Sequence, residues 1–204
     1  MSFASYSAFR TAVSTWLDVS DVTTTSLDDI IQVGEAYVNR KLRVELMEAP
    51  IAVTINSAGT ATLPSDFLEA QHLYLDRSPV AVLQPKSAEW IFRKYPTRTA
   101  TGIPQFVAQT NSTFIFGPAP DSTDVVAGTY YAKPASLPGT ATINSVFSAY
   151  PEIYLWAALA NAEVFLGRDS RVAWQGKCDE AIERANQEHR RRLWSGGPIA
   201  MSPG

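Results

Sequence analysis

Cysteine and histidine are nearly absent from this chain. One cysteine, Cys178, and two histidines, His72 and His189, occur among 204 residues. A single cysteine cannot form an intramolecular disulfide, so the fold should not depend on an oxidising compartment. No HxxxH or CxxC spacing occurs, which argues against zinc. We therefore expect no metal and no cofactor.

Long apolar runs and an excess of one charge are also missing. No window approaches the roughly 18 apolar residues of a membrane helix, and the opening residues MSFASYSAFR lack the pattern of a secretory signal. We expect a soluble protein that is not exported. Seventeen Lys and Arg oppose 20 Asp and Glu, a net charge of -3. This balance argues against non-specific DNA binding, which requires phosphate neutralisation.

Catalytic motifs are scarce as well. Gly176 and Lys177 form the only Gly-Lys pair, which lacks the first glycine of a phosphate-binding loop, and no G-x-S-x-G occurs. We expect Cys178 to be a small buried hydrophobe. Residues 111–113 match the sequon for N-glycosylation, but we interpret them as a polar hairpin turn. Four carboxylates are explained by helix capping and solvation: those of Asp28, Asp29, Glu45 and Glu48. We therefore expect that the protein is not an enzyme.

Helical periodicity opens the chain. Apolar residues recur at helical spacing over residues 9–17, behind the possible capping residues Ser5 and Ser7, and predict a short amphipathic helix. Ser26 with Asp29 three positions later predicts the start of a second helix, which Pro50 would stop. Its apolar face should comprise Leu27, Ile31, Val38, Leu42 and Leu46.

Between residues 51 and 140 the apolar period becomes that of a strand. Ile51, Val53 and Ile55 alternate with small or polar residues. The strand candidates are short and separated by turn residues, which favours an antiparallel sheet or small sandwich. A short helix over residues 87–95 and a mobile surface loop over 97–104 should interrupt them. The further candidates are Thr60–Leu63, His72–Leu75, Val80–Leu83, Phe106–Gln109, Thr113–Phe116 and Val125–Ala132.

Helix returns in the last third. Pro151 suits a first helical position and Gly167 a left-handed end. The sequence between them is apolar on more than one face, so this helix should be central to the core or to a subunit contact. Asp169 should cap a final helix that runs to about Trp194. Two i,i+4 ion pairs are expected on that helix: Glu180 with Arg184, and Glu188 with Arg192.

These patterns predict an α+β fold in which helices from both ends of the chain form one layer and an antiparallel β-rich lobe is inserted between them. We divide the chain into N-terminal helices (1–50), the β-rich lobe (51–140), C-terminal helices that complete the layer (141–194) and a flexible tail (195–204). The tail, SGGPIAMSPG, has no periodicity and a composition typical of a segment that orders only on a partner.

The densest positive cluster lies just before that tail. Arg190, Arg191 and Arg192 would complement the dipole at a helix C-terminus and offer donors to a phosphate or a partner carboxylate. Their charge alone leaves open a solvated helix end, a protein contact or a nucleic-acid contact. Trp194 beside them favours a protein contact, since arginine and tryptophan are common interface anchors.

Several segments, in this order, together resemble the head-to-tail connector or adaptor proteins of tailed bacteriophages. They are EAYVNRKLR from residue 35, TLPSDFLEAQHLYLD from 62, FGPAPD from 116 and YYAKPASL from 130. The longest is FSAYPEIYLWAALANAEVFLGRDSRVAWQGKCDEAIERAN from residue 147. The likeness extends over nearly the whole chain, and Leu63–Phe67 and Tyr150–Leu155 carry most of it.

The resemblance implies a structural virion protein without catalytic residues. Its copies would form a dodecameric ring beneath the portal protein and join it to a tail or nozzle protein. DNA would pass through this ring without specific binding. The protein would be made in the host bacterial cytoplasm and reside in the neck of the virion.

Two sets of contact residues follow as hypotheses. A loop contact to the tail or to a neighbouring subunit would use Arg98 and Ile103, because long loops on a sheet are common recognition elements. A contact to the portal would use the end of the last helix and the tail, through Arg190, Arg191, Arg192, Leu193, Trp194, Pro198, Ile199 and Met201.

Two other functions compete with the adaptor. A β-rich binding module of a phage tail, for carbohydrate or protein, would need an exposed aromatic platform. Tyr130 and Tyr131 could supply part of one, but neighbouring residues on a strand face opposite sides, so both cannot serve. A small hydrolase would need two carboxylates that converge in a pocket, which no spacing suggests.

Overall fold

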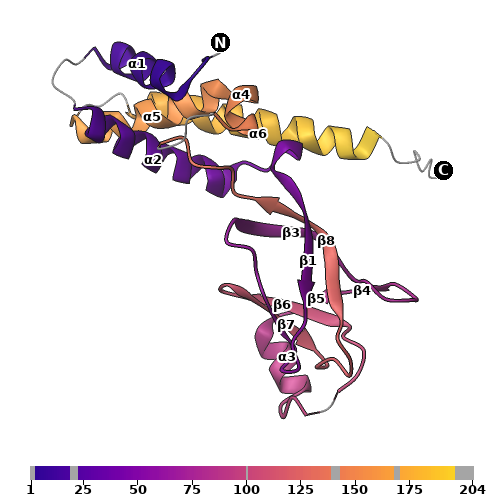
Figure 1. Cartoon of the computed structure of the whole chain (residues 1–204). Coiled ribbons are helices and arrows are strands. Elements are labelled where there is room, and N and C mark those ends of the chain that lie inside the picture. The colour runs from indigo at the N-terminus through magenta and orange to yellow at the C-terminus, as the bar shows by residue number, and fades with distance from the viewer. Residues whose placement is uncertain (1–2, 19–22, 100, 139–142, 168–170, 196–204) are drawn as a thin grey trace. The chain divides into compact units, whose positions relative to one another are not determined.

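Residues 3–18, 23–99, 101–138, 143–167 and 171–195 are described by the computed structural model of the chain. The fold is α+β, as predicted. It contains two compact units, both visible in Figure 1: a helical unit of Met1–Met47 with Pro134–Gly204, and a β unit of Glu48–Lys133. The four-part division at residues 50, 140 and 194 stays a prediction.

Helix α5 is the centre of the helical unit. Ten of its residues are buried, on more than one face, as its apolar sequence indicates. Helices α2 and α6 run alongside it (Figure 1). Gly34 permits the approach of α2, because a Cβ there would lie 3.1 Å from backbone atoms of Ala157 and Ala158. The elements of this unit are α1 (Tyr6–Leu17), α2 (Thr24–Lys41), the 3-10 helix η1 (Glu45–Met47), α4 (Ser145–Ala149), α5 (Pro151–Phe165) and α6 (Arg171–Ser195).

The predicted start of α1 is confirmed, and the predicted limits of α2 are wrong. Ser5 caps α1 by accepting from the backbone N–H of Ala8. Thr23, not Ser26, caps α2, because its hydroxyl accepts from the N–H of Ser26. α2 ends at Lys41, well before Pro50, so Leu46 lies outside the apolar face and is 48% exposed.

The early end of α2 results from a contact with α6. The side-chain carbonyl of Asn186 accepts from the N–H of Arg43 at 2.7 Å, and its amide donates to the carbonyl of Lys41 at 3.0 Å. Asn186 thus satisfies backbone groups where the helix ends. On α2, the Tyr37 hydroxyl and the Lys41 ammonium both donate hydrogen bonds to the Asp179 carboxylate of α6.

The C-terminal helices agree with the prediction in most respects. Pro151 is the first residue of α5, and Gly167 follows its end with φ 66°. Both predicted i,i+4 ion pairs of α6 form. The short helix α4, capped by Asn144, was not predicted. The predicted cap at Asp169 lies outside the described residues.

The β unit contains two four-stranded sheets that enclose one core. The strand orders are β1-β8-β3-β4 and β2-β7-β6-β5. Apolar residues from both sheets meet, including Leu75 and Val126 from the first and Phe114 and Phe116 from the second. The strands are β1 (Glu48–Thr54), β2 (Thr60–Thr62), β3 (Phe67–Leu75), β4 (Ala81–Val82), β5 (Gln84–Pro85), β6 (Phe106–Thr110), β7 (Thr113–Gly117) and β8 (Val125–Ala132).

Two details of the β unit differ from the prediction. The strand expected at Val80–Leu83 is present as the shorter β4. The chain changes sheet at Leu83, and a strand that was not predicted, β5, follows. β5 then pairs with β6 in parallel, whereas every other pairing between the named strands is antiparallel. The predicted short helix is present as α3 (Ala88–Lys94), capped by Ser87. The predicted polar turn joins β6 to β7, with Asn111 at φ 50°.

Candidate functional site

Two of the residues considered for catalysis, Cys178 and Asp28, have structural contacts. Cys178 is fully buried, its thiol lies 3.7 Å from the carbonyl oxygen of Ile153, and burial raises its pKa to about 12. Asp28 accepts a hydrogen bond from the Tyr6 hydroxyl at 2.5 Å and pairs with Arg10 at 3.4 Å. In the part of the chain that the structure describes, no three His, Cys, Asp or Glu residues are grouped to hold a metal ion.

The proposed carbohydrate platform is not formed by its two tyrosines. Tyr130 and Tyr131 are only 5% and 9% exposed. Tyr130 stacks on Phe67 and donates its hydroxyl proton to Asp66, so it belongs to the core of the β unit. None of the described helices has the length and apolar character that a membrane span requires.

The C-terminal turns of α6 carry the predicted portal-contact residues. Arg190 pairs with Glu183 at 2.8 Å, and Arg192 pairs with Glu188 at 2.6 Å. Arg192 also lies 3.6 Å from Glu45. Arg191 forms no ion pair with any described residue. Leu193, which lies on nearly the opposite side of α6, is 59% exposed. The side chain of Trp194 and all of Pro198, Ile199 and Met201 lie outside the described residues.

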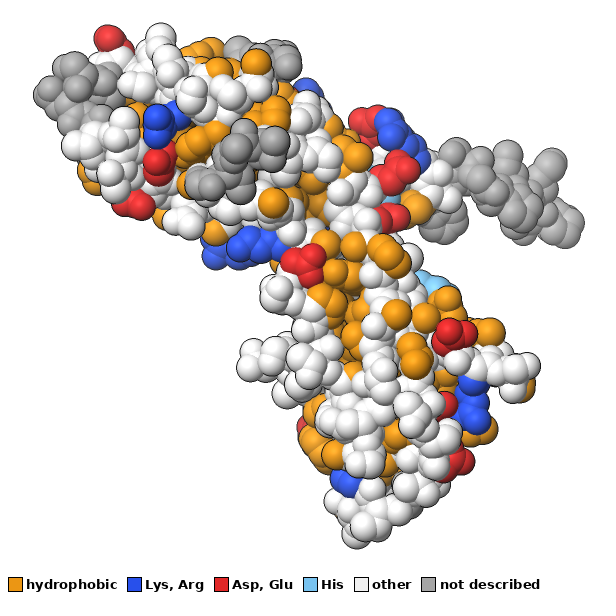
Figure 2. Space-filling view, viewed as in Figure 1, with side chains coloured by type: hydrophobic (Ala, Val, Ile, Leu, Met, Phe, Trp, Pro, Cys, Tyr) orange, Lys and Arg blue, Asp and Glu red, His pale blue; other side chains and the backbone are white. Residues whose placement is uncertain are grey.

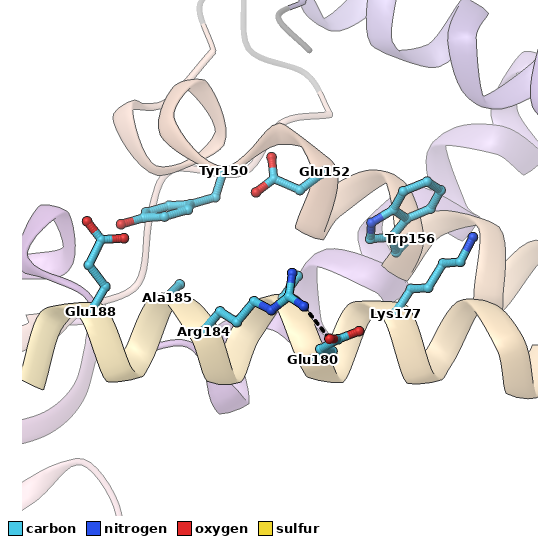
Figure 3. Close-up of a pocket in the computed structure, with 9 residues that line it drawn as sticks. Tyr150, Glu152, Trp156, Lys177, Glu180, Arg184, Ala185 and Glu188 are labelled. Carbon is cyan, nitrogen blue, oxygen red and sulfur yellow. Dashed lines mark hydrogen bonds and ion pairs between the residues drawn. The ribbon is translucent and has the colours of Figure 1, made fainter.

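A polar groove of about 360 Å³ runs between α5 and α6 (Figure 3). Tyr150, Glu152 and Trp156 line it from the α5 side, and α6 contributes alternating charges. Burial, and then the nearby Glu188 carboxylate, raise the pKa of Tyr150. The α6 residues along the groove are Lys177, Glu180, Ala181, Arg184, Ala185 and Glu188.

At one end of that groove lies a tryptophan cluster, which we define as Trp16, Trp156 and Trp174 together with Lys177. Trp156 and Trp174 stack in parallel, with ring centroids 5.4 Å apart, and Trp16 from α1 meets both edge-on. The Lys177 ammonium lies 5.1 Å and 4.7 Å from the two stacked ring centroids. Trp16 is 46% exposed, so a large aromatic surface faces outward.

A second, apolar groove of about 340 Å³ lies between α2 and α5. We call it the α2/α5 groove. Val33, Val164 and Phe165 are each more than half exposed there. Its full lining is Ser26, Asp29, Ile30, Val33, Asn161, Val164 and Phe165.

The two residues predicted for the loop contact of the β unit, Arg98 and Ile103, differ in their surroundings. Arg98, at φ 55°, donates to the carbonyls of Phe116 at 2.6 Å, Ala58 at 2.8 Å and Gly59 at 3.0 Å. Burial lowers the pKa of its guanidinium. Ile103 is 46% exposed and offers an apolar contact surface.

Charged side chains of both signs are mixed on the face of the molecule shown in Figure 2. The sequence suggested the residues at the end of α6 and in the loop, and their roles stay predictions. It missed the α2/α5 groove and the tryptophan cluster, in which Trp16 of α1 meets residues of the distant helices α5 and α6. Only the high tryptophan count, five in 204 residues, could have directed attention to the cluster.

Similarity to known proteins identifies the family of the chain. No curated protein matches the chain. The family model of the SU10 adaptor protein matches residues 4–202, which include nearly all of both units. This family comprises bacteriophage head-tail adaptors, so the resemblance noted in the sequence is confirmed. The chain therefore belongs to the SU10 adaptor protein family.

Proposed function

We propose that this adaptor is a ring-forming subunit of the phage neck that binds the portal protein on one side and a tail or nozzle protein on the other. The match to the adaptor family over residues 4–202 carries the proposal. DNA passes through the ring without specific binding. The ring is dodecameric, and its subunits are made in the cytoplasm of the bacterial host.

The charge of the chain supports a role as a conduit. A net charge of -3 disfavours retention of DNA, and Arg190 and Arg192 of the arginine cluster are already paired with carboxylates. A ring whose cationic side chains bound DNA phosphates would slow the passage of the DNA. The structural role of the family also indicates that the protein is not an enzyme.

Arg191 and Leu193 are the residues of the proposed portal contact that we would test first, because both are exposed and Arg191 has no carboxylate partner among the described residues. They lie on different sides of α6, so each variant tests a different side. We expect Arg191→Glu and Leu193→Asp each to weaken binding to the purified portal ring at least about tenfold. Arg184→Glu reverses a charge on α6 outside the contact and serves as the matched control. Unchanged portal binding by both test variants would refute the assignment.

The tail residues Pro198, Ile199 and Met201 need a separate variant. A chain that ends at Ser195 keeps all of α6 and removes only residues 196–204. We expect it to bind the portal more weakly in the same assay, since a segment that orders on its partner contributes contacts there. Full affinity of this shortened chain would limit the contact to α6.

The tail-side contact is best tested at Ile103. Ile103→Asp places a charge on an exposed apolar residue without removing an internal hydrogen bond. We expect this variant to join the portal normally and to attach fewer tails, as counted by electron microscopy of assembled particles. Normal tail attachment would exclude Ile103 from the contact.

A further inference from the structure

Two unlike surfaces lie on opposite sides of α5. With about 3.6 residues per turn, Asn161, Val164 and Phe165 share one side of this helix, while Glu152 and Trp156 share the other. The first side lines the α2/α5 groove, and the second lines the groove that ends at the tryptophan cluster. One copy of the chain can therefore use both surfaces at once, each toward a different neighbour.

The two surfaces are complementary in shape and polarity. The α2/α5 groove is a hollow lined by exposed aliphatic and aromatic side chains, whereas the tryptophan cluster presents the half-exposed ring of Trp16. Buried aromatic anchors in apolar hollows contribute most of the binding energy in many interfaces. An apolar surface of this kind is rarely left in water.

The surfaces are also complementary in charge. Asp29 at the edge of the α2/α5 groove is exposed and has no ion pair among the described residues. Lys177 contacts the rings of Trp156 and Trp174, and it has no carboxylate partner in the described part of the chain. Two copies of the groove facing each other would instead bring two Asp29 carboxylates together, which is unfavourable.

We propose that the α2/α5 groove of one copy receives the tryptophan cluster of the next copy, with Asp29 paired to Lys177 across the contact. Because the two surfaces differ, the contact is head-to-tail, and such contacts build a ring when the rotation closes. The inference rests on the proposed ring function and names the surfaces by which one helical unit meets the next.

Charge reversal tests this pairing in the full chain. Asp29→Lys and Lys177→Asp each place like charges together, and we expect each to lower the fraction of ring formed on the portal at least about tenfold. The double variant restores opposite charges, so the ring should return. Asp121→Lys, an exposed reversal in the β unit, is the control, and thermal melting verifies that each variant folds.

The outcomes separate this inference from the proposed function. Rings from either single variant in wild-type amount, or a double variant that fails to regain the ring, would overturn the pairing while the adaptor function stands. Absence of a ring from the wild-type chain on its portal would overturn both. Native mass spectrometry distinguishes these results, because it reports the number of copies on each portal.

Discussion

Gly34 determines how closely α2 can approach α5. A Cβ at position 34 would lie only 3.1 Å from backbone atoms of Ala157 and Ala158. We predict that Gly34→Val lowers the free energy of unfolding by about 1–3 kcal/mol, because the added carbons would overpack a rigid helix contact. Chemical denaturation of the full chain, followed by circular dichroism, measures the change.

Gly176 on α6 provides the matched control for that substitution. A Cβ at Gly176 would meet no atom within 4 Å. Gly176→Val should leave stability within about 0.5 kcal/mol of the wild type, since valine is slightly better than glycine in a helix. Equal losses for the two variants would show that close packing is not the reason for glycine at position 34.

Arg98 holds the start of its loop against the turn before β2. Its three hydrogen bonds to backbone carbonyls lead us to predict that Arg98→Ala destabilises the chain by about 1–2 kcal/mol. Arg98→Lys should recover only part of this, because an ammonium cannot reproduce the guanidinium fork. Arg93→Ala, an exposed arginine on α3, is the control in urea unfolding. A loss as small as that of the control would contradict the structural role.

Single residues were predictable where the reason was local. The turn at Asn111 and the cap at Ser5 depend on neighbouring residues, and the burial of Cys178 follows from its place on an apolar stripe. The cap of α2 was misassigned because Thr23 and Ser26 are both able to cap, and only the backbone geometry selects Thr23. The internal bonds of Arg98 depend on Ala58 and Gly59, which are far away in sequence.

Among the helices, α2 and α6 are joined by a small polar cluster. Asp179 of α6 accepts hydrogen bonds from the Tyr37 hydroxyl and from the Lys41 ammonium of α2. Partial burial acts to raise the pKa of Asp179, but the hydrogen bonds from Lys41 and Tyr37 prevail and lower it below its usual value. The same contacts raise the pKa of Lys41. The pair therefore stays charged at neutral pH.

This cluster predicts a pH dependence of stability. A carboxyl whose folded pKa is lowered stabilises the fold above its ordinary pKa of about 4, and this contribution is lost as the pH falls through the folded pKa. Asp179→Asn should cost up to about 1 kcal/mol at pH 7, since the pair is partly exposed. The difference from the wild type should shrink below about pH 4.

Unfolding curves at several pH values provide the measurement. Glu180→Gln, which removes an exposed carboxyl of α6 paired only within its own helix, should have a smaller effect. A difference between the wild type and Asp179→Asn that stays constant from pH 7 to pH 3 would contradict the role assigned to the cluster.

Most helices and strands could be predicted because their apolar periods are clear. Errors occurred where a distant contact decides the outcome. α2 ends at Lys41 because Asn186 of α6 satisfies its last backbone groups, and no local Gly or Pro marks that place. The change of sheet between β4 and β5 is likewise unmarked, because strand partners are set by sheet assembly and not by the two-residue strands themselves.

For the whole molecule, the sequence supported the family better than it supported the site. Several sequence segments that occur in a particular order along the chain indicated the adaptor family, and the match over residues 4–202 confirms it. Surfaces built by several helices could not be found that way. The tryptophan cluster needs α1, α5 and α6 to converge, and the α2/α5 groove needs the close helix approach at Gly34.

Assembly on the portal is the central claim of this account. The most direct measurement is the mass and rotational symmetry of the purified chain, alone and mixed with the portal protein of its phage, by native mass spectrometry and negative-stain imaging. We predict a ring of adaptor copies that matches the symmetry of the portal. A chain that remains monomeric and unbound beside an intact portal would contradict the account.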